Sequence, residues 1–126
     1  MEDIKRTENE TQEESTGLSV VTDSDTEVPQ GAYVHELKKP FVYEDKTYTK
    51  FVFDFENLIG EDLVEIENEM AAVGEYALSP EISTSFLYRM AAKAAGVGSD
   101  VIAHLPVVDF GRIKNKSRDF LISTGY

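Results

Sequence analysis

The sequence holds residue types found in catalytic and metal sites, but not at the spacings that such sites need. Its two histidines, His35 and His104, lie far apart, and no acidic cluster follows the D-x-[DN]-x-[DN]-G or H-E-x-x-H pattern of a metal site. Gly96-Val97-Gly98 matches neither a P-loop nor a dinucleotide fingerprint, and no serine lies in a G-x-S-x-G turn. We therefore expect no enzyme activity, no catalytic residue, no metal and no cofactor, and a protein whose work is to bind other proteins.

Composition narrows the classes of partner and compartment. The net charge of −12 would repel a phosphate backbone, so ordinary nucleic-acid binding is not expected. The sequence has no cysteine, which excludes disulfides and thiolate metal sites. No apolar run has the length of a membrane span, and the N-terminal residues lack the apolar core of a secretory signal. These features predict a cytosolic protein that contacts no membrane.

The charges are unevenly distributed along the chain. Residues 54–75 contain eight acids and no base, whereas residues 112–118 contain four bases. Such runs are either solvated faces or complementary surfaces that meet a partner or a second copy of the chain. Under the second interpretation, five residues are candidates for partner binding: Glu61, Glu65, Glu69, Arg112 and Lys116. The three glutamates are four residues apart on a predicted helix, so they repel one another on one exposed side.

The first 31 residues differ in composition from the rest. They are rich in Glu, Thr, Ser and Asp and poor in large apolar side chains, which predicts a disordered acidic tail at residues 1–31. Leu18-Ser19-Val20-Val21 is an apolar exception, either a docking motif or a chance cluster. Residues 32–126 are then expected to form a single domain.

Two aromatic segments, residues 33–43 and 47–55, predict a β-hairpin. A loop of three residues, Glu44-Asp45-Lys46, would pair Tyr43 with Thr47. This register gathers most of the large side chains on one face, at Leu37, Phe41, Tyr43, Phe51, Phe53 and Phe55. Tyr48 and Val52 then fall on the other face. A two-residue loop at Asp45-Lys46 would divide the aromatic residues between the faces, so we prefer the longer loop.

The remainder reads as helices that cover this hairpin. Apolar residues at helical spacing predict a first helix over residues 60–73, and Ser79-Pro80-Glu81 predicts the start of a second that ends before Gly96. A short turn over residues 100–105 and a last helix over 109–123, capped by Asp109, complete the pattern. The predicted fold class is α+β, an N-terminal β-hairpin packed on a small bundle of three to four helices.

The order of these parts resembles a known family. The sequence between Leu37 and Leu121 is similar to the small tail assembly chaperones of tailed bacteriophages, encoded beside the tape-measure gene. The most specific motifs are Asp45-Lys46-Thr47-Tyr48, Ala92-Lys93-Ala94-Ala95-Gly96 and Leu105-Pro106-x-x-Asp109-Phe110. The chain departs from the family pattern at the turn, where the family often has Gly after Asp and this chain has Lys46. The long acidic tail is a second departure.

The resemblance implies a non-enzymatic chaperone in the cytoplasm of the infected host. It would bind the tape-measure protein, with the tail-tube subunit as a further partner, keep its partner soluble and be absent from the finished virion. Two alternatives stay open: an acidic DNA-mimic inhibitor of a host enzyme, which the acids of residues 54–75 favour, and a structural head–tail joining subunit. Self-association is also expected, because alanine-rich helix faces allow close approach.

Overall fold

The computed structural model describes residues 28–126. Most of the predicted acidic tail, including Leu18-Ser19-Val20-Val21, lies outside the described residues. The described chain divides into two compact units. The hairpin unit is residues 36–51, and the helical unit combines residues 28–35 with residues 52–126.

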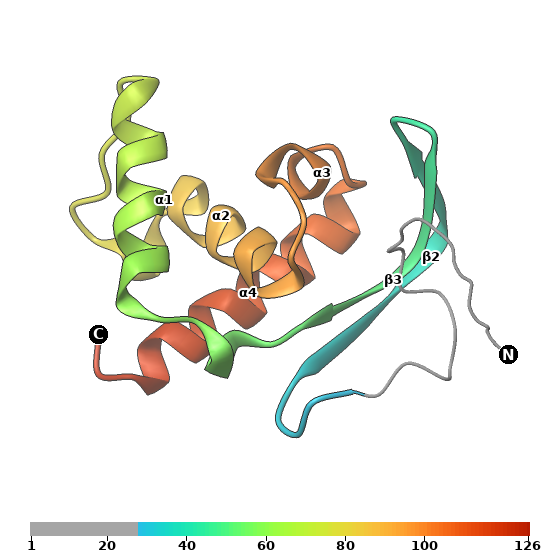
Figure 1. Cartoon of the computed structure of the whole chain (residues 1–126), viewed down its shortest axis with the longest axis horizontal. Coiled ribbons are helices and arrows are strands. Elements are labelled where there is room, and N and C mark those ends of the chain that lie inside the picture. Colours follow the sequence, from blue (N-terminus) through green and yellow to red (C-terminus); the bar gives the residue numbers. More distant parts are fainter. Residues whose placement is uncertain (1–27) are drawn as a thin grey trace, which may run out of the picture. The chain divides into compact units, whose positions relative to one another are not determined.

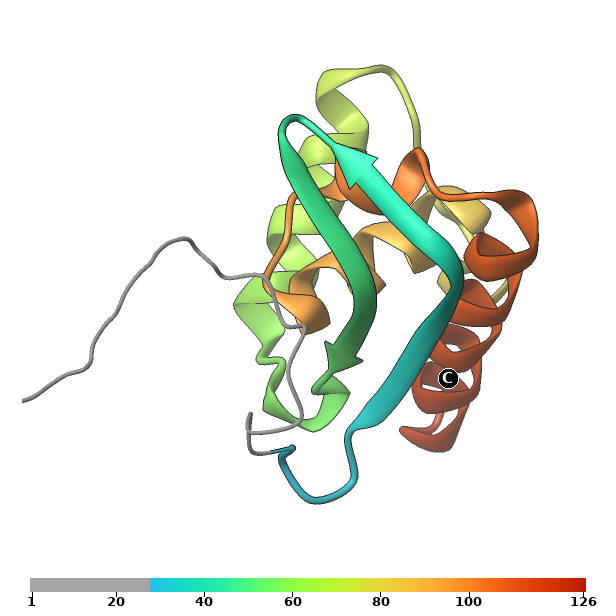
Figure 2. The same ribbon diagram turned by 90° about the vertical axis from the view of Figure 1, so that its right-hand side faces the viewer.

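A two-stranded hairpin followed by four helices confirms the α+β class. Strand β2 (Tyr33–Tyr43) pairs with β3 (Lys46–Phe53), and Figure 2 shows the two strands side by side up to the turn that joins them. The base of the hairpin, residues 33–35 and 52–53, belongs to the helical unit. Both strands are rich in aromatic and β-branched residues, which favour a pleated, half-buried surface.

The turn is shorter than the sequence suggested. Its two residues, Glu44 and Asp45, have φ angles of 49° and 69°, whereas Lys46 already belongs to β3. Two consecutive residues with positive φ are characteristic of a type I′ turn, whose twist matches that of the flanking strands. The predicted three-residue loop is therefore wrong. The twist of the hairpin favours the two-residue turn, even though neither turn residue is glycine.

The register of the aromatic face changes along β3. In the hairpin unit, the ring centroid of Tyr48 lies 6.2 Å from that of Phe41 and 5.1 Å from that of Phe51. Tyr48 and Phe51 are three residues apart, so they share a face only because the strand alternation is interrupted between them, as an extra residue would do. The prediction that placed Tyr48 on the other face of the hairpin from Phe41 and Phe51 is wrong.

The base of the hairpin follows the predicted pattern. In the helical unit, Phe53 is fully buried and its ring stacks on Tyr33 at 5.8 Å and on Phe55 at 5.9 Å. Phe55 begins a short 3-10 turn, η2 (Phe55–Asn57), and stacks on Phe120 at 5.5 Å. Aromatic contacts of this kind add to the stabilisation from area burial. Phe53 and Phe55 therefore lie in the core, as predicted.

The helical unit is assembled around α2. It contains α1 (Gly60–Ala72), η3 (Pro80–Ile82), α2 (Thr84–Ala95), α3 (Ser99–Ala103) and α4 (Val107–Ser123). Helix α2 packs against α1, α3 and α4 and lies between α1 and α4 in Figure 1. Its sequence meets this demand with five buried apolar residues: Phe86, Leu87, Met90, Ala91 and Ala92. Ala91 and Ala92, part of the alanine-rich face on which the expected self-association rests, are thus buried within the helical unit.

The predicted start of α2 at Pro80 needs correction. Pro80 begins η3, a separate turn, and the chain is extended at Ser83 before α2 begins. The Ser83 hydroxyl accepts a hydrogen bond from the backbone N–H of Phe86 at 3.1 Å, so Ser83 is the N-cap. The proline signal marked a real helical turn, but a second capping residue three positions later separates that turn from the helix.

Glycine substitutions distinguish the observed turn from the predicted one. We expect Asp45→Gly to stabilise the hairpin by about 0.5–1 kcal/mol, because glycine adopts positive φ without the steric cost of a side chain. Lys46→Gly should destabilise it by about 0.5–1 kcal/mol, because Lys46 is a strand residue. Native-state amide hydrogen exchange of residues 36–51 measures both changes. The reverse order of effects would support the three-residue loop.

Candidate functional site

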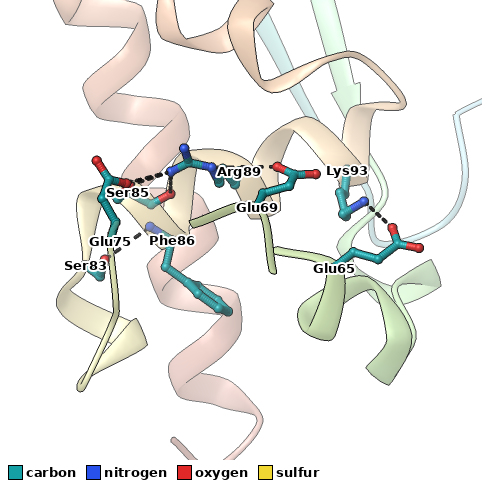
Figure 3. Close-up of polar contacts among 8 residues, drawn as sticks. All are labelled: Glu65, Glu69, Glu75, Ser83, Ser85, Phe86, Arg89 and Lys93. Atoms are coloured by element: carbon teal, nitrogen blue, oxygen red, sulfur yellow. Dashed lines mark hydrogen bonds and ion pairs between the residues drawn. The ribbon is translucent and has the colours of Figure 1, made fainter. Parts of the chain in front are cut away.

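The predicted acidic residues of α1 face a second helix. Lys93 Nζ of α2 lies 2.6 Å from Glu65 Oε1, and Arg89 Nε of α2 lies 3.7 Å from Glu69 Oε1 (Figure 3). Glu61, Glu65 and Glu69 lie on an exposed side of α1, as predicted, but two of them also have basic partners that the sequence analysis did not identify. The bases that neutralise them, Arg89 and Lys93, come from α2, about 20–28 residues later in the sequence. They are four residues apart, so helical periodicity places both on one face of α2. Glu61, in the first turn of α1, is exposed.

Arg89 joins α1, α2 and the segment between them. Its guanidinium donates to the Ser85 carbonyl at 3.0 Å and to the Ser85 hydroxyl, and it lies 3.4 Å from Glu75 Oε1. The Ser85 hydroxyl donates to the same Glu75 oxygen, so the three side chains form one cluster (Figure 3). The Arg89 side chain is only 11% exposed and lies over the Tyr88 ring at 5.0 Å. A largely buried guanidinium needs such partners, so it fixes the position of Glu75.

The Lys93–Glu65 ion pair is more exposed than the Arg89–Glu69 ion pair. The hydrogen bond between Lys93 and Glu65 raises the pKa of Lys93 above its ordinary value. Burial of Lys93 lowers its pKa by a smaller amount. The charge of Glu65 and the charges of Glu69 and Asp62 add to the increase. Because the Glu65 side chain is 55% exposed, water screens this pair and its contribution to folding is small.

The segment between α1 and α2 carries the features that the sequence analysis missed. We call residues 73–82 the α1–α2 linker. Four of its large apolar side chains are exposed, namely those of Val73, Tyr76, Leu78 and Ile82. Tyr76 is 79% exposed and Leu78 is 98% exposed, so neither contributes to a core. The only signal in the sequence was a run of apolar residues between two helix ends. Such a run resembles a core segment as long as the packing of the helices is unknown.

An open pocket of about 230 Å³ adjoins the linker. It is lined by Glu67 and Met70 of α1 and by four linker residues, Glu75, Tyr76, Ala77 and Leu78. Small-molecule sites usually have volumes of about 300–1,000 Å³ and enclose their ligand. A smaller, open pocket suits one or two side chains of a protein partner.

The start of the linker has a fixed backbone. Gly74 has a φ of 79° at the end of α1, a left-handed conformation that favours glycine. The N–H of Glu75 donates to the Met70 carbonyl at 2.8 Å, and that of Gly74 donates to the Ala71 carbonyl at 3.0 Å. These two bonds form a Schellman motif. Together with the Arg89 cluster, they hold the residue that precedes Tyr76.

The two basic candidates lie elsewhere in the helical unit. Lys116 Nζ is 5.1 Å from the centroid of the Tyr33 ring, a cation–π contact. Burial raises the pKa of the Tyr33 hydroxyl, Arg112 opposes this increase and Asp109 adds to it. Arg112 and Lys116 thus lie around Tyr33. Within residues 28–126, no hydrogen bond or ion pair joins Arg112 or Lys116 to Glu61, Glu65 or Glu69. The five predicted residues therefore form two groups, the acids of α1 and the bases of α4.

A buried polar chain connects the base of the hairpin to α4. His35 Nε2 lies 2.8 Å from Asp109 Oδ1, and the Tyr33 hydroxyl lies 2.8 Å from His35 Nδ1. His35 is 5% exposed and Asp109 is 2% exposed. Asp109 therefore satisfies a buried histidine instead of capping α4, which begins two residues earlier. The enclosure of this chain and its mutual hydrogen bonds suit a structural role.

Comparisons with known proteins identify no relative. No protein-family model, curated protein sequence or solved structure matches the chain. Among residues 28–126, no group of three potential metal-ligating side chains is found. None of the helices in the same region is long and apolar enough to cross a membrane.

The role of Arg89 can be tested against that of Lys93, a matched base four residues later on α2. We expect Arg89→Met to lower the free energy of unfolding by about 1–3 kcal/mol, because it removes several charge-assisted hydrogen bonds. Lys93→Met should lower it by less than about 1 kcal/mol, because its pair is exposed. Urea denaturation measures both values. Equal losses would show that Arg89 does not anchor the linker.

Proposed function

We propose that the protein is a non-enzymatic assembly factor, a phage tail assembly chaperone that binds the tape-measure protein and keeps it soluble. The tail-tube subunit is a further proposed partner. The proposal places the protein in the host cytoplasm and outside the finished particle. It rests on the resemblance over residues 37–121 and on one structural observation, the exposed apolar side chains of the α1–α2 linker.

The linker supports a binding role because its exposed apolar side chains lie outside the core. An exposed group of large apolar side chains costs solubility and commonly marks a contact with another protein. Leu78, at 98% exposed, is the extreme case. A chaperone for an elongated, aggregation-prone partner needs apolar contacts within a charged, soluble surface, and the net charge of −12 supplies the second requirement.

The DNA-mimic alternative has less support. A mimic needs carboxylates that are free to replace phosphates, but Glu65 and Glu69 form ion pairs with Lys93 and Arg89. Neutralisation by α2 interrupts the row of negative charge that favoured this alternative. The structure offers no observation that favours a head–tail joining subunit over a chaperone.

Co-expression tests the proposal directly. We expect a tape-measure fragment that is insoluble alone to become soluble when co-expressed with this protein, and to co-purify with it. The physical reason is that binding covers apolar surface that would otherwise associate between fragments. The measurement is the soluble fraction of the fragment, with an unrelated acidic protein of similar size as the control.

Failure to co-purify and to increase solubility would contradict the chaperone proposal. Mass spectrometry of purified particles adds a separate check. Stoichiometric amounts of the protein in finished particles would favour the joining-subunit alternative.

A further inference from the structure

The exposed linker defines the size of what can bind it. The pocket beside Tyr76 and Leu78 has a volume of about 230 Å³ and is open on one side. Its walls are apolar at Met70 and Ala77, so it accepts one or two apolar side chains and leaves the rest of the ligand outside. Leu78 and Ile82 extend the exposed apolar surface along the linker. This surface suits an amphipathic segment that carries several apolar residues on one side.

The charge near the pocket defines the other side of that segment. Glu67 and Glu75 line the pocket, and both side chains are exposed. The nearby base is Arg89, which is largely buried and already contacts Glu75. Carboxylates beside an apolar surface attract basic residues and repel acidic ones, which gives both faster association and selectivity.

The linker is prepared for binding by its anchored ends. The Schellman motif and the Arg89 cluster fix Gly74 and Glu75, and the Ser83 cap fixes the start of α2. Fixed ends lower the ordering cost that a flexible apolar loop would incur on binding.

We propose that the α1–α2 linker is the docking site for a basic amphipathic helix of another protein. Apolar residues of that helix contact Tyr76, Leu78 and the pocket, and its lysine or arginine residues face Glu67 beside the pocket. The inference deepens the proposed protein-binding function, on which it rests, by naming the contact surface and the chemistry of the ligand. A helix fits better than a strand because the linker lies between two helices and offers no strand edge.

A second copy of this chain is a poorer occupant. Its most basic helix is α4, which buries Ile113 and Leu121 within its own unit. The exposed apolar side chains of α4, those of Val107, Val108 and Ile122, lie at the two ends of the helix. That helix could offer bases from its middle but apolar anchors only at its ends.

A designed peptide provides the probe. It is a fluorescein-labelled helix of about 18 residues, long enough to span about 27 Å, with leucine on one face and lysine on the other. Fluorescence anisotropy with the full-length protein measures its Kd. We expect a second peptide, with every lysine replaced by glutamate, to bind at least about tenfold more weakly, because like charges oppose it.

Variants of the protein locate the site. Tyr76→Ser combined with Leu78→Ser should weaken binding of the lysine peptide by at least about tenfold, as expected for central apolar anchors. Two controls should leave the Kd within about twofold, since neither residue belongs to the linker or lines the pocket. Val107→Ser removes another apolar side chain, 81% exposed, and Glu56→Gln removes another exposed acid. Circular dichroism establishes that each variant is folded.

Three results would overturn the inference: an unchanged Kd for the double variant, equal loss in a control variant, or equal binding of both peptides. Self-association that the double variant abolishes, without peptide binding, would place a second copy on the linker and would also overturn it. Co-expression separates this inference from the proposed function. If the double variant still solubilises the tape-measure fragment, the docking site is wrong but the chaperone proposal stands. Site-specific peptide binding without solubilisation gives the opposite conclusion.

Discussion

The burial of α2 is the constraint on which the helical unit depends. This helix has apolar residues around most of its circumference, and it buries them against α1, α3 and α4. Its two bases, Arg89 and Lys93, lie on the side that meets α1. Because a guanidinium cannot be buried without partners, Arg89 contacts Ser85 of α2, Glu75 of the linker and Glu69 of α1. One acid of α1, Glu69, therefore takes part in the packing of α2.

This requirement also determines what is left exposed. Helix α1 buries only Ile66 and Met70 fully, and its ion pairs with α2 complete the contact. The chain then has to return from the end of α1 to the start of α2 through the linker. Arg89 holds the beginning of that linker through Glu75, which leaves Tyr76 and Leu78 outside the core. The arrangement that stabilises the helices thus also presents an apolar surface on a fixed support.

Local signals in the sequence predicted the class, the helices and the core position of Phe53. They did so because periodicity and glycine stops are local properties. The two-residue turn was missed because neither of its residues is the glycine that such turns favour. The contact between His35 and Asp109 joins residues 74 positions apart, and no pattern in one sequence encodes such a distance. The exposure of Leu78 was missed for the same reason, since burial depends on how distant elements pack.

Site-specific photo-crosslinking tests the central claim, that the α1–α2 linker is the surface that holds a partner. A benzophenone amino acid placed at Leu78 is compared with the same group at Val107, which is also exposed. With a co-expressed tape-measure fragment, the account predicts a covalent adduct from position 78 and little or none from position 107. An adduct from position 107 with none from position 78 would contradict it, because the partner would then lie on another surface.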